Sequence, residues 1–152
     1  MVRESPRILI VDDDRIVRLI LHETLDRMGA NYRVETAIDG RDALTKLDRD
    51  NYDLMITDLK LPEMGGVELT RLVRSRKMML NVIWISAYTD GKVEEEATEL
   101  HVFQFLHKPL GIAQIRAAAQ AALNADNGQA HQTIGSKQDG TDEQAHRGVG
   151  GE

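Results

Sequence analysis

The sequence predicts an α/β fold in which five parallel strands form one doubly wound sheet covered by five helices. Two observations predict this class: short apolar runs of strand length recur along the chain, and the segments between them have helical spacing and helix-start residues. The apolar runs lie near residues 7–12, 32–36, 53–57, 81–86 and 102–106. Five successive strand–helix units place parallel strands in one sheet with helices on both faces.

The first two helices are expected from the residues at their starts. The first helix follows Asp14 and should end at Gly29, because glycine is common just after a helix. Its apolar face is expected to carry Ile16, Val17, Ile20, Leu21, Leu25 and Met28. The second helix opens at Asp39 and Gly40, and its apolar face carries Ala43, Leu44 and Leu47.

The remaining helices and the strands follow the same logic. A third helix is expected over residues 66–74, and a fourth begins near Asp90. The fifth has apolar residues at spacings of three and four, namely Ile112, Ile115, Ala119 and Leu123. The run at residues 32–36 alternates apolar and polar side chains, which predicts an edge strand. The other four runs are expected to form buried centre strands.

Composition excludes several classes of protein. A chain of 152 residues is long enough for one domain with its own core. A net charge of −6 argues against direct nucleic-acid binding, because phosphate backbones are bound mainly by Lys and Arg. The absence of cysteine excludes disulfides and thiolate metal sites. No segment reads as a signal peptide or a membrane span, so we expect a cytoplasmic protein with no membrane contact.

The last part of the chain differs in character from the rest. Residues 124–152 are rich in Gly, Gln, Asp, Asn and His, with Ile134 and Val149 as the only large aliphatic residues. Such a segment cannot bury enough apolar surface to offset the entropy of ordering the chain. We therefore expect one domain over residues 1–123 and a disordered polar tail over residues 124–152.

Polar residues follow four of the five apolar runs at the point where each run ends. These residues are Asp12, Asp13, Asp58, Ser86 and Lys108. Because the carboxyl ends of parallel strands line one crevice, their side chains should converge. Three carboxylates, a hydroxyl group and an ammonium group are the equipment for metal-assisted transfer of a phosphoryl group onto a carboxylate.

The run of three acids at residues 12–14 indicates a metal site. Asp14 is explained as the cap of the first helix, but capping accounts for only one of the three carboxylates. A hard cation bound through oxygen atoms would relieve the repulsion between the others. Mg²⁺ fits, because it needs only one or two carboxylates together with water and phosphate oxygens.

Four motifs carry a resemblance to a known family: Ile-Leu-Ile-Val-Asp-Asp-Asp at 8–14, Asp-Leu-Met-Ile-Thr-Asp-Leu-Lys-Leu-Pro at 53–62, Ile-Ser-Ala at 85–87 and Lys-Pro at 108–109. From about residue 7 to residue 123 the chain resembles the receiver domain of two-component response regulators, of the single-domain, chemotaxis-regulator type. The resemblance implies a flavodoxin-like fold with strand order 2-1-3-4-5.

The resemblance also implies a phosphoacceptor and a metal site. Asp58 would accept a phosphoryl group from a sensor histidine kinase or a histidine phosphotransfer protein and become 4-aspartylphosphate. Mg²⁺ would be held by Asp12, Asp13, Asp58 and the main-chain carbonyl of Lys60. No enzymatic activity is expected beyond the domain's own phosphorylation and dephosphorylation.

The other implied roles belong to the switch. Ser86 would hydrogen-bond the phosphoryl oxygens, and Lys108 would pair with them. As Ser86 moves, Phe105 would turn inward and change the surface of the fourth helix, fifth strand and fifth helix, which a downstream protein target reads. The chain departs from the family where His101-Val102 replaces a frequent Gly-Ala, and Phe105 lacks the hydroxyl group of tyrosine.

Three alternatives accompany this interpretation. A phosphatase resembling the haloacid dehalogenase family would use Asp12 as nucleophile and Asp14 as acid–base, but it leaves Asp58 unexplained. A receiver that only binds partners would not need competent residues at all five functional positions. The chain could also be the amino-terminal piece of a longer regulator.

Lys60 and Tyr88 are not suited to orient a hydrolytic water, which predicts slow loss of the phosphoryl group.

Overall fold

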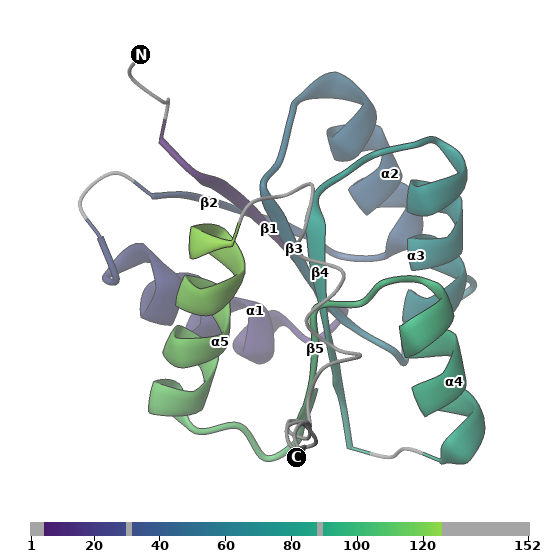
Figure 1. Cartoon of the computed structure of the whole chain (residues 1–152). Coiled ribbons are helices and arrows are strands. Elements are labelled where there is room, and N and C mark those ends of the chain that lie inside the picture. Colours follow the sequence, from purple (N-terminus) through teal and green to yellow (C-terminus); the bar gives the residue numbers. More distant parts are fainter. Residues whose placement is uncertain (1–4, 30–31, 88–89, 126–152) are drawn as a thin grey trace, which may run out of the picture.

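Strands and helices alternate along the chain as the sequence predicts (Figure 1). The computed structural model describes residues 5–29, 32–87 and 90–125. The elements of this described part are β1 Arg7–Val11, α1 Arg15–Asp26, β2 Arg33–Ala37, α2 Gly40–Arg49, β3 Leu54–Asp58, α3 Gly66–Ser75, β4 Asn81–Ser86, α4 Gly91–Glu99, β5 Gln104–His107 and α5 Ile112–Asn124. Most of the tail predicted to be disordered lies outside the described residues, and α5 runs one residue past the predicted boundary at 123.

The sheet is parallel throughout and has the strand order β2-β1-β3-β4-β5, which confirms the predicted order. The prediction that the second strand lies at an edge is also confirmed. The prediction of a centre strand near residues 102–106 is wrong, because β5 forms the opposite edge. Val102 and Phe103, whose apolar character suggested a centre strand, are buried but precede β5.

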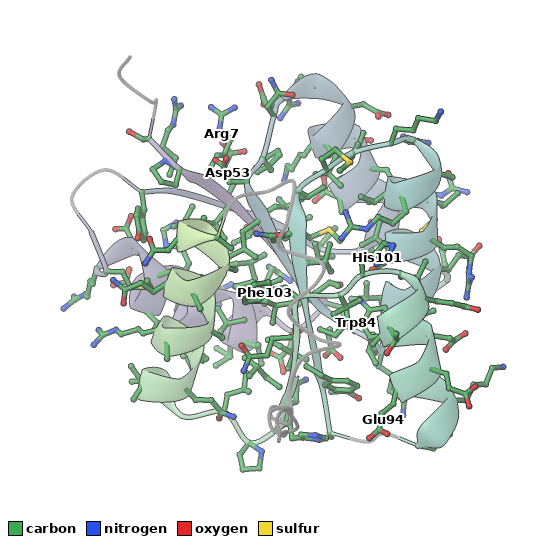
Figure 2. All side chains as sticks on the ribbon, in the orientation of Figure 1. Arg7, Asp53, Trp84, Glu94, His101 and Phe103 are labelled. Atoms are coloured by element: carbon green, nitrogen blue, oxygen red, sulfur yellow. The ribbon has the colours of Figure 1, made fainter. Side chains whose placement is uncertain are left out.

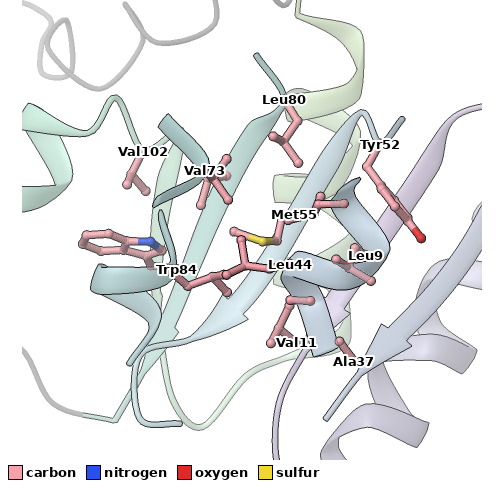
Figure 3. Close-up of a cluster of buried hydrophobic side chains, with 14 of the residues drawn as sticks. Leu9, Val11, Ala37, Leu44, Tyr52, Met55, Val73, Leu80, Trp84 and Val102 are labelled. Carbon is pink, nitrogen blue, oxygen red and sulfur yellow. The ribbon is translucent and has the colours of Figure 1, made fainter. Parts of the chain in front are cut away.

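Each face of the sheet has its own core, because successive residues of a strand point to opposite faces. Leu9, Met55 and Trp84 point to the face that α2, α3 and α4 cover, where the close-up in Figure 3 shows them. Ile10 and Ile56 point to the face covered by α1 and α5. Figure 1 shows the same arrangement, with α1 and α5 on one side of the sheet and α2, α3 and α4 on the other. The three central strands are therefore apolar on both faces.

Aspartates begin three of the helices, as expected for N-cap residues. The carboxylate of Asp14 accepts hydrogen bonds from the backbone N–H groups of Ile16 and Val17. Asp39 and Asp90 cap α2 and α4 in the same way. The predicted end of the first helix is wrong: α1 stops at Asp26, and the chain turns over the next two residues.

The amino-terminal end of the sheet is closed by polar contacts. The backbone N–H of Arg7 donates to the Asp53 carboxylate at 2.9 Å, and the Arg7 guanidinium pairs with Glu35 and Asp50. The hydroxyl group of Tyr52 donates to Glu35 at 2.6 Å. Figure 2 shows Arg7 and Asp53 at the end of the molecule opposite to Glu94, in the first turn of α4. These contacts leave the carboxyl ends of the strands for the site.

The loop before β5 contains a histidine in a backbone conformation that favours glycine. His101 has a φ of 56°, in the left-handed region that favours glycine. Histidine is among the non-glycine residues found there more often than most. The backbone therefore keeps the conformation that glycine would adopt. The guanidinium of Arg74 braces this loop by donating to the carbonyl oxygens of Leu100 and His101.

Candidate functional site

The polar residues predicted at the strand ends lie together at the carboxyl edge of the sheet. Asp12 directly follows β1, Asp58 ends β3, Ser86 ends β4 and Lys108 directly follows β5. They surround an open cavity of about 600 Å³, whose lining includes Asp12, Asp13, Asp58, Lys60, Ser86 and Lys108. Phe105 is not among the residues that line this cavity, and it lies on β5 next to Trp84 of β4.

Asp58 is held at both carboxylate oxygens. Its Oδ2 accepts a hydrogen bond from Lys108 Nζ at 2.7 Å, and its Oδ1 accepts one from the backbone N–H of Lys60 at 3.0 Å. The Asp58 side chain is nearly buried, so this ion pair is poorly screened by water. Burial lowers the pKa of Lys108, but the hydrogen bond and charge of Asp58, together with the charges of Asp12 and Asp13, raise that pKa above its ordinary value. Lys108 is therefore a cation when it faces the carboxylate.

The carboxylates of Asp12, Asp13 and Asp58 form one cluster. Carboxylate oxygens of Asp12, Asp13 and Asp58 lie within 4.8 Å of one another, with Asp13 exposed and the other two buried. Burial raises the pKa of Asp12 to about 6. The hydrogen bond from the backbone N–H of Asp14 acts in the opposite direction, whereas the negative charge of Asp58 raises this pKa further. A donor set of close, partly buried carboxylates fits a hard divalent cation.

The loop after β3 is shaped to bring the chain close to Asp58. A Cβ atom added to Gly66 would lie 2.4 Å from the carbonyl oxygen of Asp58, so only glycine fits there. The backbone N–H of Gly66 donates to Leu59 O at 2.9 Å, and Glu63 turns the loop with a φ of 69°. The loop places Lys60 beside Asp58. The role of its main-chain carbonyl as a ligand of Mg²⁺ stays a prediction.

Two predicted residues remain, Ser86 and Tyr88. Ser86 is buried at the end of β4 and lines the cavity, and its carbonyl oxygen accepts a hydrogen bond from the backbone N–H of Lys108 at 2.9 Å. Tyr88, which entered the prediction of slow dephosphorylation, lies outside the described residues. That prediction therefore stays untested.

Sequence reasoning missed an apolar surface next to the cavity. Ile16, Leu19 and Ile20 of α1 are each about half exposed, at 54%, 54% and 50%, and Ile112 at the start of α5 is 53% exposed. The three residues of α1 are spaced by three and four positions, so they share one face of the helix. Helical spacing alone predicts that Ile16 and Ile20 face the core. Only the packing of α1 against its neighbours shows that they do not.

Sequence reasoning also missed the contacts of Trp84. This fully buried side chain donates from Nε1 to Thr70 Oγ1 of α3 at 2.8 Å, and its ring contacts Phe105. A threonine inside a helix gives no signal of such a bond in the sequence.

Among the described residues, no helix has the length and apolar character that crossing a bilayer requires.

Comparison with known proteins agrees with this geometry. The family model of the response regulator receiver domain matches residues 8–120. The sporulation initiation phosphotransferase F of Bacillus subtilis is 32% identical over 119 residues, which cover 78% of this chain and 94% of that protein. The structure of the chemotaxis protein CheY4 of Vibrio cholerae matches with a TM-score of 0.73 and 29% identity, covering 78% of this chain and 99% of that one.

Other relatives are much longer than the matched region. The alkaline phosphatase synthesis transcriptional regulatory protein PhoP of Bacillus subtilis is 31% identical over 119 residues, or 78% of this chain and 49% of that protein. The match spans only 9% of the sensor protein EvgS of Escherichia coli. The chain thus spans half or less of several curated relatives. None of these matches supports a phosphatase resembling the haloacid dehalogenases. The family match, the fold and the clustered strand-end residues agree, and the chain belongs to the receiver domain family of response regulators.

Proposed function

We propose that Asp58 is the phosphoacceptor of a phosphorelay and that it receives its phosphoryl group from a histidine kinase or a histidine phosphotransfer protein. The observation that carries the proposal is the setting of Asp58: a buried carboxylate whose two oxygens are bound by Lys108 and by a backbone N–H, beside two further acids. Receiver domains as a family are phosphoacceptors that pair with such donors.

The proposed transfer is a displacement at phosphorus. A carboxylate oxygen of Asp58 forms a bond to phosphorus while the bond from phosphorus to the donor's histidine nitrogen breaks, and that nitrogen keeps the electron pair. Lys108 lies 2.7 Å from the attacking carboxylate, so it can neutralise a phosphoryl oxygen as charge accumulates. Ser86 lines the same cavity and can donate its hydroxyl to another oxygen of the product.

The acid cluster supports a role for magnesium. When bound, Mg²⁺ would be held by Asp12, Asp13, Asp58 and the carbonyl of Lys60, and it would neutralise charge on the transferring group. Catalysis by the chain itself is then confined to positioning and charge neutralisation. We propose no activity beyond its own phosphorylation and dephosphorylation.

The apolar surface of α1 supports a place for the phosphodonor to dock. Ile16, Leu19 and Ile20 form a face on the helix that begins directly after Asp14, a residue of the cavity rim. Exposed aliphatic side chains that share a face indicate a protein contact more strongly than scattered ones do. A donor bound there would hold its histidine over the cavity.

The output is proposed to be read by a protein. Phosphorylation would change the surface of α4, β5 and α5, and a downstream protein target would bind that surface. The net charge of −6 supports an output without direct nucleic-acid contact. A cytoplasmic location and the division into a domain over residues 1–123 and a polar tail over residues 124–152 complete the proposal.

The test uses a small phosphodonor. The protein is incubated with acetyl phosphate and Mg²⁺, and the modified residue is located by mass spectrometry. We expect one labile phosphoryl group, on Asp58, and none in Asp58→Asn. Asp48→Asn, which changes an exposed acid of α2, serves as the matched control and should be labelled like the wild type. Phosphate on Asp12, or labelling of Asp58→Asn at the wild-type rate, would contradict the proposal.

A further inference from the structure

Three rings form a row across β4 and β5 beside the site. Trp84 and Phe105 occupy paired positions on the two strands, and their rings meet edge to face with centroids 6.3 Å apart and planes at 83°. His107 lies two residues after Phe105 and therefore on the same face of the sheet. Its ring stacks on Phe105 with centroids 5.1 Å apart and planes at 10°. Phe105 thus lies between a buried indole and an exposed imidazole.

The indole side of this row is fixed. Trp84 is fully buried beneath α3 and α4, where Figure 2 labels it, and its Nε1 donates to Thr70 Oγ1 at 2.8 Å. The Thr70 hydroxyl group donates in turn to the carbonyl oxygen of Gly66 at 2.8 Å. Gly66 is packed against the carbonyl of Asp58. Trp84 is therefore tied, through Thr70 and Gly66, to the backbone of the proposed phosphoacceptor Asp58, and it has little freedom to follow a movement of Phe105.

The imidazole side lies at the surface and next to the site. His107 is exposed, and it pairs in register with Ser86, which lines the cavity. Phe105 has no hydroxyl group, so ring contacts rather than hydrogen bonds hold its side chain. A turn of the Phe105 ring toward Ser86 would break the parallel stack on His107.

We propose that His107 is a positioning residue of the switch: its stack holds Phe105 in the observed position and opposes the change that phosphorylation drives. This inference rests on the proposed function of Asp58, because it concerns the response of Phe105 to a phosphoryl group on that residue. It assigns His107 no contact with the phosphoryl group. The role depends on the flat aromatic face of the side chain and not on its size.

The expected effect follows from the strength of aromatic pairs. A stacked pair shifts an equilibrium by about two- to twelvefold beyond what burial of its area contributes. A contact that favours the unphosphorylated position of Phe105 weakens the binding of a phosphoryl mimic by up to the same factor, since the two equilibria are linked. Removing the stack should therefore tighten binding of such a mimic.

The experiment measures the binding of beryllofluoride, a mimic of the phosphoryl group, at saturating Mg²⁺. The protein is labelled with fluorophenylalanine and followed by fluorine NMR. The chain contains two phenylalanines, and Phe103, buried toward α1 and α5, is the internal reference for Phe105. Two variants are compared: His107→Leu keeps an apolar side chain without the aromatic face, and His107→Phe keeps the aromatic face.

We expect His107→Leu to bind beryllofluoride about two- to twelvefold more tightly than the wild type, and His107→Phe to bind it as the wild type does. The Phe105 signal should change on binding, whereas the Phe103 signal should not. Should His107→Leu fold poorly, His107→Met repeats the measurement with an unbranched side chain. A residue with a merely structural role would weaken binding when replaced and would not tighten it.

The outcomes distinguish a failure of the positioning role of His107 from a failure of the proposed function of Asp58. Equal binding by His107→Leu and the wild type, or equal tightening in His107→Phe, would overturn the positioning role alone, provided that Asp58→Asn abolishes binding. If the wild type does not bind beryllofluoride, or Asp58→Asn binds it equally well, the proposed function of Asp58 is wrong and the inference falls with it.

Discussion

Replacing Asp12 by Asn should stabilise the metal-free protein, and the gain should grow with pH. Asp12 is 1% exposed, and burial is the main reason why its pKa rises from an ordinary value of 3.8 to about 6. Asn retains the oxygen that accepts the hydrogen bond from the backbone N–H of Asp14. It removes the buried charge that lies close to Asp58. The variant therefore tests the electrostatic cost of the site with little change in packing.

The sign follows from proton binding. Between pH 3.8 and about 6 the folded state binds more protons at Asp12 than the unfolded state does. Stability contributed by protonated Asp12 is thus lost as pH rises through this window, and the cost is complete above it. With about 1.36 kcal/mol for each pKa unit, the full difference corresponds to about 3 kcal/mol. The gap between Asp12→Asn and the wild type should be about 1 kcal/mol at pH 4.5 and about 3 kcal/mol at pH 7.5.

The assay is urea unfolding in the presence of a chelator over this pH range. Trp84 is fully buried and is the only tryptophan of the chain, so its fluorescence reports the transition. Saturating Mg²⁺ should then narrow the gap at pH 7.5, because a ligand at a hundred times its Kd stabilises the folded wild type by about 2.7 kcal/mol. A gap that does not change with pH, or a variant less stable than the wild type at pH 7.5 under chelation, would refute the reasoning.

Three further predictions concern stability measured by the same unfolding assay. Thr70→Val should cost about 1–3 kcal/mol, because it leaves the buried N–H of Trp84 without its acceptor. Gly66→Ala should cost about 1–3 kcal/mol and slow phosphorylation by acetyl phosphate, because the added Cβ would lie 2.4 Å from a backbone oxygen of the site. Arg74→Met should cost about 2–3 kcal/mol, because its guanidinium donates to four backbone carbonyl oxygens around the loops before β4 and β5.

Matched controls separate these effects from the chemistry of the substitution itself. Thr45→Val changes an exposed threonine of α2, and Arg27→Met changes an arginine that is 74% exposed. Both should alter stability by no more than about 0.5 kcal/mol. Gly91→Ala adds a Cβ atom at a helix start where nothing lies within 4 Å, so it should not destabilise the protein. If a control variant loses as much stability as the variant with which it is paired, the assigned contact is not the cause of that loss.

Local sequence signals were sufficient for the alternation of elements and for the helix starts. Asp14, Asp39 and Asp90 each begin a helix as expected, because an N-cap is a contact between residues two or three positions apart. Helix ends carry weaker signals. The glycine at position 29 predicts a helix end there, but the turn forms earlier, where the backbone N–H of Met28 donates to Leu25 O.

The gathering of the strand-end residues could also be predicted, whereas their energetics could not. Once the strands are parallel, Asp12, Asp58 and Lys108 must lie at one edge of the sheet. The raised pKa of Asp12 depends on how completely helices and loops exclude water from it. That quantity is set by packing and has no counterpart in the order of the residues.

The sequence by itself determined the class of fold, the order of its elements and the set of strand-end residues. Apolar periodicity, capping and position at a strand end are properties of neighbouring residues, so they can be read along the chain. Only the tertiary structure decided that Ile16 faces outward and that Phe105 is held between Trp84 and His107. These features depend on which surfaces distant segments cover, and a single face of a strand or helix looks the same in the sequence whether or not another segment packs on it.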